Sequence, residues 1–312
     1  MRTKIICELA SSWNADLDLL KAMVKTVAEQ GGDLCKLQDY RASNVPATDL
    51  DKARYEKYEM KDEYYPQFLE WCKEYNIEPL VTCFNADRVK FLSRLGLKRV
   101  KIASISMTNK ELLLEAGANF EELIVSTAFH SKEEIEETID WLATNAQKFV
   151  ILHCVGNYPL DPKDANLYRI DELKKMTEGM EQASTGYSDH SLDLDVAKTA
   201  IAMGVSYVEK HFSLARELPQ IPHSMYEGGP QITTHAVSIV PAELKELAEW
   251  RDKIAVIKGY LKCINCGNDT WKDSSTYSTM EDCKKCGFST DVRKFNEVEG
   301  LIKSRYEKRY GV

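Results

Sequence analysis

Gly186-Tyr187-Ser188-Asp189-His190 and Glu209-Lys210-His211-Phe212 are the two stretches that decide how this chain is interpreted. Each places a histidine just after a short strand-like run, and a helical pattern separates the two. In a parallel α/β fold the carboxyl ends of neighbouring strands meet at one edge, so both imidazoles are expected in one cleft. Two imidazoles with coordination positions left open suit a catalytic divalent metal, whereas a single buried histidine is more often a satisfied core residue.

Strand-like and helical patterns alternate on the amino-terminal side of these motifs. Helices are expected to begin at caps such as Asp16 and at the capping box formed by Ser131 and Glu134. Eight β/α units in about 250 residues predict a (β/α)8 TIM barrel. The eight predicted strands are residues 4–8, 34–38, 79–83, 99–103, 122–126, 149–153, 184–188 and 206–210.

A TIM barrel places its active site at the carboxyl ends of its strands, and each predicted strand has a polar residue at or near that end. Lysines and hydroxyls there suit a ligand carrying a phosphate and a carboxylate. A histidine-bound metal polarises a carbonyl or activates water, and a lone carboxylate can orient or protonate an intermediate. The pattern predicts a metal-assisted enzyme acting on a small phosphorylated acid. The residues are Glu8, Lys36, Gln38, Thr82, Lys101, Ser104, Ser126, His153, Ser188, His190 and His211.

The composition of the chain changes after about residue 258. Cys263-Ile264-Asn265-Cys266-Gly267 and Cys283-Lys284-Lys285-Cys286-Gly287 form two CxxCG knuckles, which predict a ribbon with one structural Zn²⁺ bound by Cys263, Cys266, Cys283 and Cys286. A redox pair or an iron centre is the alternative. We therefore expect a barrel over residues 1–258 and a zinc ribbon with a mixed-charge terminal helix over residues 259–312.

The overall composition is that of an ordinary soluble protein: 312 residues, 44% hydrophobic and 29% charged. The net charge of −8 argues against nucleic acid or an anionic membrane as the main partner. The chain has no membrane-spanning apolar run and no signal-peptide pattern. Five further cysteines are scattered through the barrel region, which indicates a reducing, cytoplasmic location. They are Cys7, Cys35, Cys72, Cys83 and Cys154.

Eight short motifs, in order over some 240 residues, carry a family resemblance. The chain resembles the N-acetylneuraminate (sialic acid) synthase family, whose members are phosphoenolpyruvate-condensing barrels. Each motif is modest, but eight in the same order are specific. They are Glu8 with Asn14-Ala15-Asp16, Lys36-Leu37-Gln38, Thr82-x-Phe84, Lys101-Ile102-Ala103-Ser104, Val125-Ser126-Thr127, Leu152-His153-Cys154-Val155 with Tyr158-Pro159, Gly186-Tyr187-Ser188-Asp189-His190-Ser191 and Glu209-Lys210-His211-Phe212.

The resemblance implies a reaction in which C3 of phosphoenolpyruvate attacks a sugar aldehyde. Water adds at C2, and phosphate leaves by C–O cleavage to give a 2-keto-3-deoxy sugar acid. It also implies a homodimer and a divalent metal, Mn²⁺ or similar. By match, His190 and His211 hold that metal, Glu8 and Gln38 face the reacting carbons and the sugar, and Tyr158 binds the sugar. The residues expected to hold phosphoenolpyruvate are Lys36, Thr82, Lys101, Ser104, Ser126 and Ser188.

Four positions depart from the family pattern, and all are expected on the aldehyde side of the site. Trp13 replaces a histidine, Ser106 an acidic residue and Gly156 a polar residue, while Gln231 stands near the place of a sugar-binding aspartate. The departures predict the same chemistry on a different acceptor. The family commonly carries an antifreeze-like domain that lends an arginine to a partner's site, and here the ribbon stands in its place. The ribbon's role as lid, dimer arm, docking module or brace is left open.

Two other functions remain compatible with the sequence. One is another metal-dependent TIM-barrel aldolase or a different phosphoenolpyruvate condenser. The other is a non-catalytic barrel that uses the ribbon to bind partners. The joint presence of Glu8, His190 and His211 argues against a non-catalytic relic.

Overall fold

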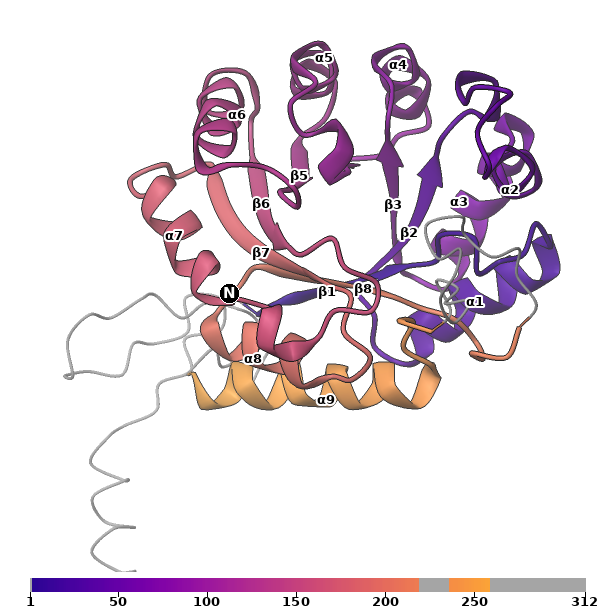
Figure 1. Cartoon of the computed structure of the whole chain (residues 1–312). Helices are drawn as coiled ribbons and strands as arrows, with labels where there is room; N and C mark the ends of the chain where they lie inside the picture. The colour runs from indigo at the N-terminus through magenta and orange to yellow at the C-terminus, as the bar shows by residue number, and fades with distance from the viewer. Residues whose placement is uncertain (1, 219–235, 259–312) are drawn as a thin grey trace, which may run out of the picture. The chain divides into compact units, whose positions relative to one another are not determined.

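The computed structural model describes residues 2–218 and 236–258, and Arg2–Ile254 form one compact unit. Its centre is a closed barrel in which each strand pairs in parallel with the next and β8 pairs with β1 (Figure 1). The predicted TIM barrel is confirmed, and each predicted strand overlaps an observed one. The strands are β1 (Lys4–Glu8), β2 (Leu34–Asp39), β3 (Glu78–Cys83), β4 (Arg99–Ile102), β5 (Glu122–Ser126), β6 (Phe149–Cys154), β7 (Ala183–Asp189) and β8 (Tyr207–His211).

Helices connect the strands and surround the barrel (Figure 1). Asp16 caps the first helix by accepting from the backbone N–H groups of Asp18 and Leu19, and Ser131 and Glu134 form the expected capping box. The helices are α1 (Leu17–Glu29), α2 (Lys52–Tyr58), α3 (Tyr65–Glu74), α4 (Ala86–Arg94), α5 (Lys110–Asn119), α6 (Lys132–Asn145), α7 (Tyr168–Met176), α8 (Asp195–Met203) and α9 (Pro241–Ile257). Short 3₁₀ turns include η3 (Ser104–Ser106), directly after β4.

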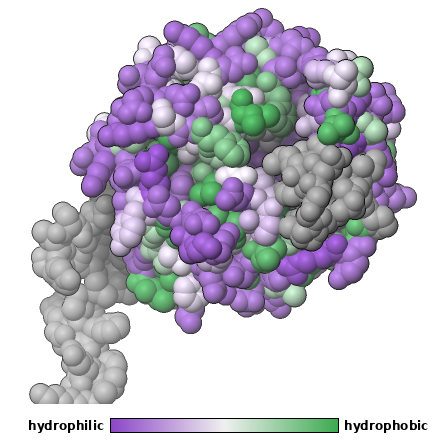
Figure 2. Space-filling view, in the orientation of Figure 1, coloured by the Kyte–Doolittle hydropathy of each residue, from purple (hydrophilic) through white to green (hydrophobic). Residues whose placement is uncertain are grey.

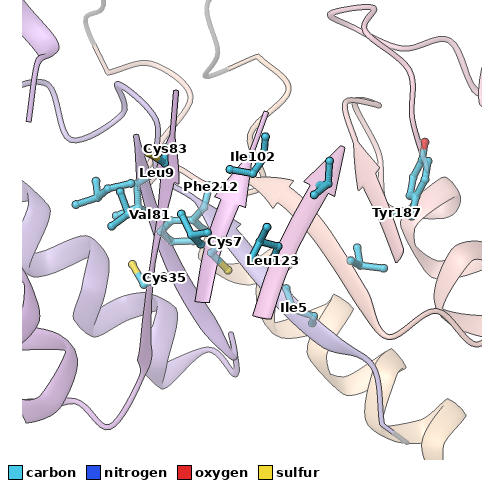
Figure 3. Close-up of a cluster of buried hydrophobic side chains, with 14 of the residues drawn as sticks. Ile5, Cys7, Leu9, Cys35, Val81, Cys83, Ile102, Leu123, Tyr187 and Phe212 are labelled. Carbon is cyan, nitrogen blue, oxygen red and sulfur yellow. The ribbon is translucent and has the colours of Figure 1, made fainter. Parts of the chain in front are cut away.

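Alternation along the strands sorts the side chains into two sets. One set points to the helices and joins the main apolar core, as with Ile5, Cys7 and Val81 (Figure 3). The other set fills the barrel interior with a separate apolar cluster. This inner cluster is Ile6, Leu34, Leu80, Ile124, Val150, Leu152 and Tyr207. The residue two positions beyond the last cluster member of each strand therefore projects inward above this cluster.

Gly186 on β7 faces the barrel interior and cannot carry a side chain there. A Cβ at this position would lie 2.2 Å from Cδ2 of Leu152 and 2.8 Å from the carbonyl oxygen of Tyr207. Distances this short are not tolerated between carbon and its neighbours, so the absent Cβ leaves the space that Leu152 occupies. This packing explains why the Gly186-Tyr187-Ser188 motif begins with glycine.

Helix α9 returns the chain to the beginning of the barrel. Leu244 and Leu247 of this helix are fully buried in the main core. Arg251 is 2% exposed, and its Nη1 lies 2.6 Å from Oδ2 of Asp33 and donates to the carbonyl oxygen of Gly31 at 2.9 Å. A buried, paired arginine thus ties α9 to the segment before β2.

Several sequence predictions fall outside the described residues. These are the zinc ligands Cys263, Cys266, Cys283 and Cys286, the terminal helix over 291–312 and the departure at Gln231. The five scattered cysteines are described, and all are buried free thiols. Among the helices that the structure describes, none is long and apolar enough to cross a membrane.

Candidate active site

A cavity of about 520 Å³ opens at the carboxyl ends of the strands. Seven of the eight strands reach it with a residue expected from the sequence, and the exception is β6, which reaches it with Cys154. Of the residues that the sequence predicts for the barrel site, all except His153 line this cavity. They are Glu8, Lys36, Gln38, Thr82, Lys101, Ser104, Ser126, Tyr158, Ser188, His190 and His211.

The floor of the cavity is a buried ion-pair network centred on Lys36. Its Nζ lies 2.7 Å from Oε2 of Glu8 and 2.7 Å from Oε2 of Glu209. Glu8 also accepts from the backbone N–H of Ala10 through Oε1 at 2.7 Å. All three charged side chains are more than nine-tenths buried, so each depends on the others for stabilisation.

Burial and pairing compete at each of these groups. Burial raises the pKa of Glu8, and the nearby Lys36 ammonium only partly offsets it. Burial would lower the pKa of Lys36, but the Glu209 and Glu8 carboxylates outweigh it and raise the pKa. Burial alone would raise the pKa of Glu209, yet Lys101 and Lys36 hold it well below its usual range. Of the two carboxylates, Glu8 is therefore the one that accepts a proton more readily.

Lys101 is the less completely neutralised cation of the site. Its Nζ donates to Oγ of Ser126 at 2.6 Å but stands 3.9 Å from Oε1 of Glu209, whose closer partner at that oxygen is the Ser188 hydroxyl at 3.0 Å. Burial lowers the pKa of Lys101 to about 8. A buried ammonium with a distant counter-charge is suited to bind an anion, because the anion completes its pairing.

The tautomer of His190 is set by its surroundings. Nδ1 lies 2.8 Å from the carbonyl oxygen of Val155, which can only accept, so Nδ1 carries the proton. The lone pair of Nε2 then accepts from the Tyr158 hydroxyl at 2.6 Å, and the two rings stack with centroids 3.8 Å apart. A ring oriented by a backbone carbonyl through Nδ1 is the usual arrangement of a histidine that ligates through Nε2.

His211 is the second imidazole, with its ring centroid 5.7 Å from that of His190. Its Nδ1 is buried and has no hydrogen-bond partner. Burial lowers the pKa of His190 to about 4, and burial with the neighbouring His190 lowers the pKa of His211 well below its usual range. Both rings are therefore neutral near pH 7, the state required for metal binding.

Within residues 2–218 and 236–258, no group of three or more histidine, cysteine, aspartate or glutamate side chains is arranged as a metal cluster. The two imidazoles and the unpartnered nitrogen of His211 nonetheless fit a divalent metal that takes its other ligands from water or substrate oxygens. Such an open, oxygen-rich coordination suits Mn²⁺ or a similar ion better than a closed structural zinc.

Two sequence expectations for the site are wrong. His153 does not line the cavity, because it follows the inward-facing Leu152 and so points outward, where its Nε2 lies 2.8 Å from the carbonyl oxygen of Ala165. Trp13 does not line it either; it is 1% exposed and belongs to the apolar core. The other described departures, Ser106 and Gly156, do line the cavity as expected.

The cavity also contains residues that the sequence analysis did not select. Glu209 stands two residues before His211, so strand alternation alone places both on the inner face. Arg54 on α2 reaches the cavity and donates to Oγ of Ser11 at 2.9 Å. No pattern in the sequence indicates that this charged, tyrosine-rich segment turns toward the barrel mouth. The loop residue Phe129 also lines the cavity, and no sequence pattern predicts this either.

Taken together, the cavity offers cations and hydroxyls on one side, two neutral imidazoles, and a carboxyl group able to exchange a proton. This set can bind a phosphorylated acid, polarise a carbonyl through a metal and manage one proton.

Comparisons with known proteins agree with the fold and the motifs. Residues 23–262 match the NeuB family. The chain is 31% identical over 264 residues to N,N'-diacetyllegionaminic acid synthase of Campylobacter jejuni, covering 79% of this chain and 74% of that protein. It is also 31% identical to the protein of the same name from Legionella pneumophila, covering 78% and 70% of the two chains. The crystal structure of N-acetylneuraminic acid (sialic acid) synthetase from Leptospira borgpetersenii superposes with a TM-score of 0.76 at 23% identity, covering 99% of this chain and 93% of that one, and supports the fold.

Proposed function

This chain belongs to the NeuB family, and from that premise we propose that it condenses phosphoenolpyruvate with a sugar aldehyde. The products are a 2-keto-3-deoxy sugar acid and inorganic phosphate. The observation that carries the proposal is the single cavity lined by two buried lysines, a row of hydroxyls, two imidazoles and Glu8. Relatives named N,N'-diacetyllegionaminic acid synthase and pseudaminic acid synthase support the same class of reaction.

Phosphoenolpyruvate binds on the side of Lys101. Its phosphate and carboxylate carry about three negative charges, which need cations and donors in a site with little water. Lys101 is held by Ser126 and has only a distant carboxylate partner, so it is the natural partner of the phosphate. The remaining donors of this subsite are Lys36, Thr82, Ser104, Ser126 and Ser188. The buried Oγ1 of Thr82 has no protein partner, which agrees with a ligand contact at that atom.

The condensation forms two σ bonds, one between carbons and one from water to C2, and breaks the C2–O bond to phosphate. C3 of phosphoenolpyruvate forms a C–C bond to the aldehyde carbon, and water adds to C2. The C2–O bond then breaks, and the electron pair leaves with the bridging oxygen in phosphate. Glu8, whose pKa is raised by burial, accepts one proton of the incoming water and passes it to the former aldehyde oxygen, with Lys36 holding the carboxyl group in place. The second water proton leaves with phosphate when the C2 hydroxyl becomes the keto group.

The divalent metal would be held by Nε2 of His190 and by His211, and when bound it polarises the aldehyde oxygen and lowers the pKa of a bound water. The protein's own contribution is orientation. The Val155 carbonyl fixes the His190 tautomer, and the Tyr158 hydroxyl moves from Nε2 to an oxygen of the acceptor when that nitrogen is taken. Gln38 lies on the inner face of β2 beyond Lys36 and contributes an amide to the same acceptor.

The acceptor is proposed to be an open-chain N-acylated amino sugar related to N-acetylmannosamine. Release of inorganic phosphate from phosphoenolpyruvate with Mn²⁺ tests this across N-acetylmannosamine, its 6-deoxy diamino relatives, mannose, arabinose and shorter aldehydes. We expect acceptor-dependent release with at least one N-acylated amino sugar. Release that is independent of any acceptor, or none while phosphoenolpyruvate fails to bind, would contradict the proposal.

A further inference from the structure

Phe129, in the loop that follows β5, is an unusual residue in the cavity wall. Its side chain is 74% exposed although it lines the cavity, and its backbone has φ +70°. A bulky residue other than glycine pays conformational energy in this left-handed region. An exposed ring gains little burial to offset that energy, so the strain points to a role outside folding.

The loop holds this conformation through two contacts with Ser104. The backbone N–H of Ala128 donates to Oγ of Ser104 at 3.0 Å, and Nε2 of His130 lies 2.8 Å from the Ser104 carbonyl oxygen. Phe129 stands between these two anchors. Its backbone is therefore fixed on both sides while its ring remains exposed at the cavity.

Gly156, after β6, provides the space against which the ring is placed. A Cβ at this position would lie 1.8 Å from Cζ of Phe129 and 2.4 Å from its Cε1. No residue with a side chain fits at 156 while the Phe129 ring stays where it is. The two positions are thus matched: the polar side chain expected at 156 from the family pattern is absent, and an aromatic ring occupies the space.

Ile105 extends this apolar part of the wall. It lies on η3 between Ser104 and Ser106, lines the same cavity and is 75% exposed. Large exposed hydrophobic residues are few in the described part of the chain, and green groups form only small patches on the largely hydrophilic face in view (Figure 2). Two of them on adjoining loops make an apolar surface in the wall of one cavity.

We propose that Phe129, with Ile105, is a specificity-determining residue that packs against an apolar substituent of the acceptor, such as the methyl of an acyl group or of a deoxy carbon. The inference rests on the proposed condensation and names its acceptor more narrowly. An aromatic face selects a methyl group over a hydroxyl there because a hydroxyl would lose its water without gaining a partner.

The first test compares acceptors that differ by one apolar group, using phosphate release under saturating phosphoenolpyruvate. The pairs are 6-deoxy-N-acetylmannosamine against N-acetylmannosamine, and N-acetylmannosamine against N-formylmannosamine. We expect the wild-type protein to prefer the more apolar member of at least one pair. In Phe129→Ala that ratio of kcat/KM should fall roughly tenfold, while KM for phosphoenolpyruvate stays within about twofold. Tyr168→Ala is the matched control, because this aromatic on α7 is 82% exposed and does not line the cavity.

The second test is independent of activity. Phe129→Gly relieves the left-handed strain and removes little buried area, so its Tm should equal or exceed that of the wild-type protein. In Gly156→Ala the new Cβ meets only the far end of the exposed ring, which can swing aside, so its Tm should stay within roughly 2 °C of the wild-type value.

The outcomes separate the inference from the proposed function. Wild-type turnover with unchanged acceptor ratios in Phe129→Ala would overturn the inference and leave the condensation standing. No phosphate release with any of these acceptors in the wild-type protein would count against the condensation. The Tm of Phe129→Gly would then decide whether the Phe129 ring is structural. A Tm of Phe129→Gly more than roughly 2 °C below wild type would show the ring to be structural and overturn the inference.

Discussion

Replacing Lys101 by methionine should stabilise the protein while lowering its activity by roughly two orders of magnitude. Lys101 is 2% exposed, and burial lowers the pKa of its ammonium from 10.5 to about 8. The difference between these values corresponds to roughly 3 kcal/mol by which the charged group destabilises the folded state near pH 7. Loss of the hydrogen bond to Ser126 lowers the free energy of unfolding of the variant by roughly 1 kcal/mol. The net expectation is a gain of about 2 kcal/mol in the free energy of unfolding.

The stabilisation expected from Lys101→Met depends on pH. The folded protein releases the Lys101 proton near pH 8, whereas the unfolded chain keeps it until about 10.5. The destabilisation is thus fully present below pH 8 and is lost as the pH rises toward 10.5. The gain from Lys101→Met should therefore be largest at pH 7 and should shrink at pH 9.5.

Urea unfolding of both proteins at pH 7 and 9.5, in buffer with a chelator, measures the effect directly. Lys90→Met serves as the control, because Lys90 is 67% exposed and its substitution should change stability by well under 1 kcal/mol. Phosphate release by Lys101→Met should fall by roughly two orders of magnitude. In the wild-type protein kcat/KM for phosphoenolpyruvate should decline above about pH 8. A Lys101→Met protein that is less stable than wild type at pH 7, or a gain that does not shrink with pH, would refute the reasoning.

Three further substitutions probe the site and its support. Glu209→Gln removes a carboxylate that raises the pKa of Lys101, so the alkaline decline in kcat/KM for phosphoenolpyruvate should begin below pH 8; an unmoved profile would count against the pairing. His211→Ala should abolish turnover with the circular dichroism spectrum unchanged, and near-normal turnover would contradict the assignment of His211 as a metal ligand. Lys210→Met leaves the fully buried Asp189 without its ion pair at 2.7 Å, which should cost roughly 3–5 kcal/mol in urea unfolding; a loss below 1 kcal/mol would show that the pair is not needed.

The barrel could be predicted from the sequence because its strands are short apolar runs closed by polar residues. Each of the eight predicted strands overlaps the observed one. Helix α7 was not predicted, and its composition explains why: only Ile170 and Leu173 are buried among its nine residues, so it shows little amphipathic pattern. Helix α2 was missed for a similar reason, since only Tyr58 is buried in it.

The candidate site was predictable where strand alternation and motifs agree. Glu8 and His211 end their strands on the inner face, Lys36 lies on the inner face of β2, and all three line the cavity as expected. His153 also lies near a strand end, but it follows the inward-facing Leu152, so strand alternation turns its side chain away from the cavity. The same alternation places Glu209, two residues before His211, on the inner face.

Other features depend on tertiary structure alone. The left-handed backbone of Phe129 and its fit against Gly156 come from loops that meet only in the folded protein. The zinc ribbon, the homodimer and the cytoplasmic location stay predictions from the sequence.

The measurement that tests the central claim most directly follows the bridging oxygen of phosphoenolpyruvate. Phosphoenolpyruvate labelled with ¹⁸O at the C2–O–P position is turned over with the acceptor that supports phosphate release, and both products are analysed by mass spectrometry. Condensation with C–O cleavage places the label in inorganic phosphate. The 2-keto-3-deoxy acid is then unlabelled. Label retained in the organic product, or pyruvate formed without any new C–C bond, would contradict the account.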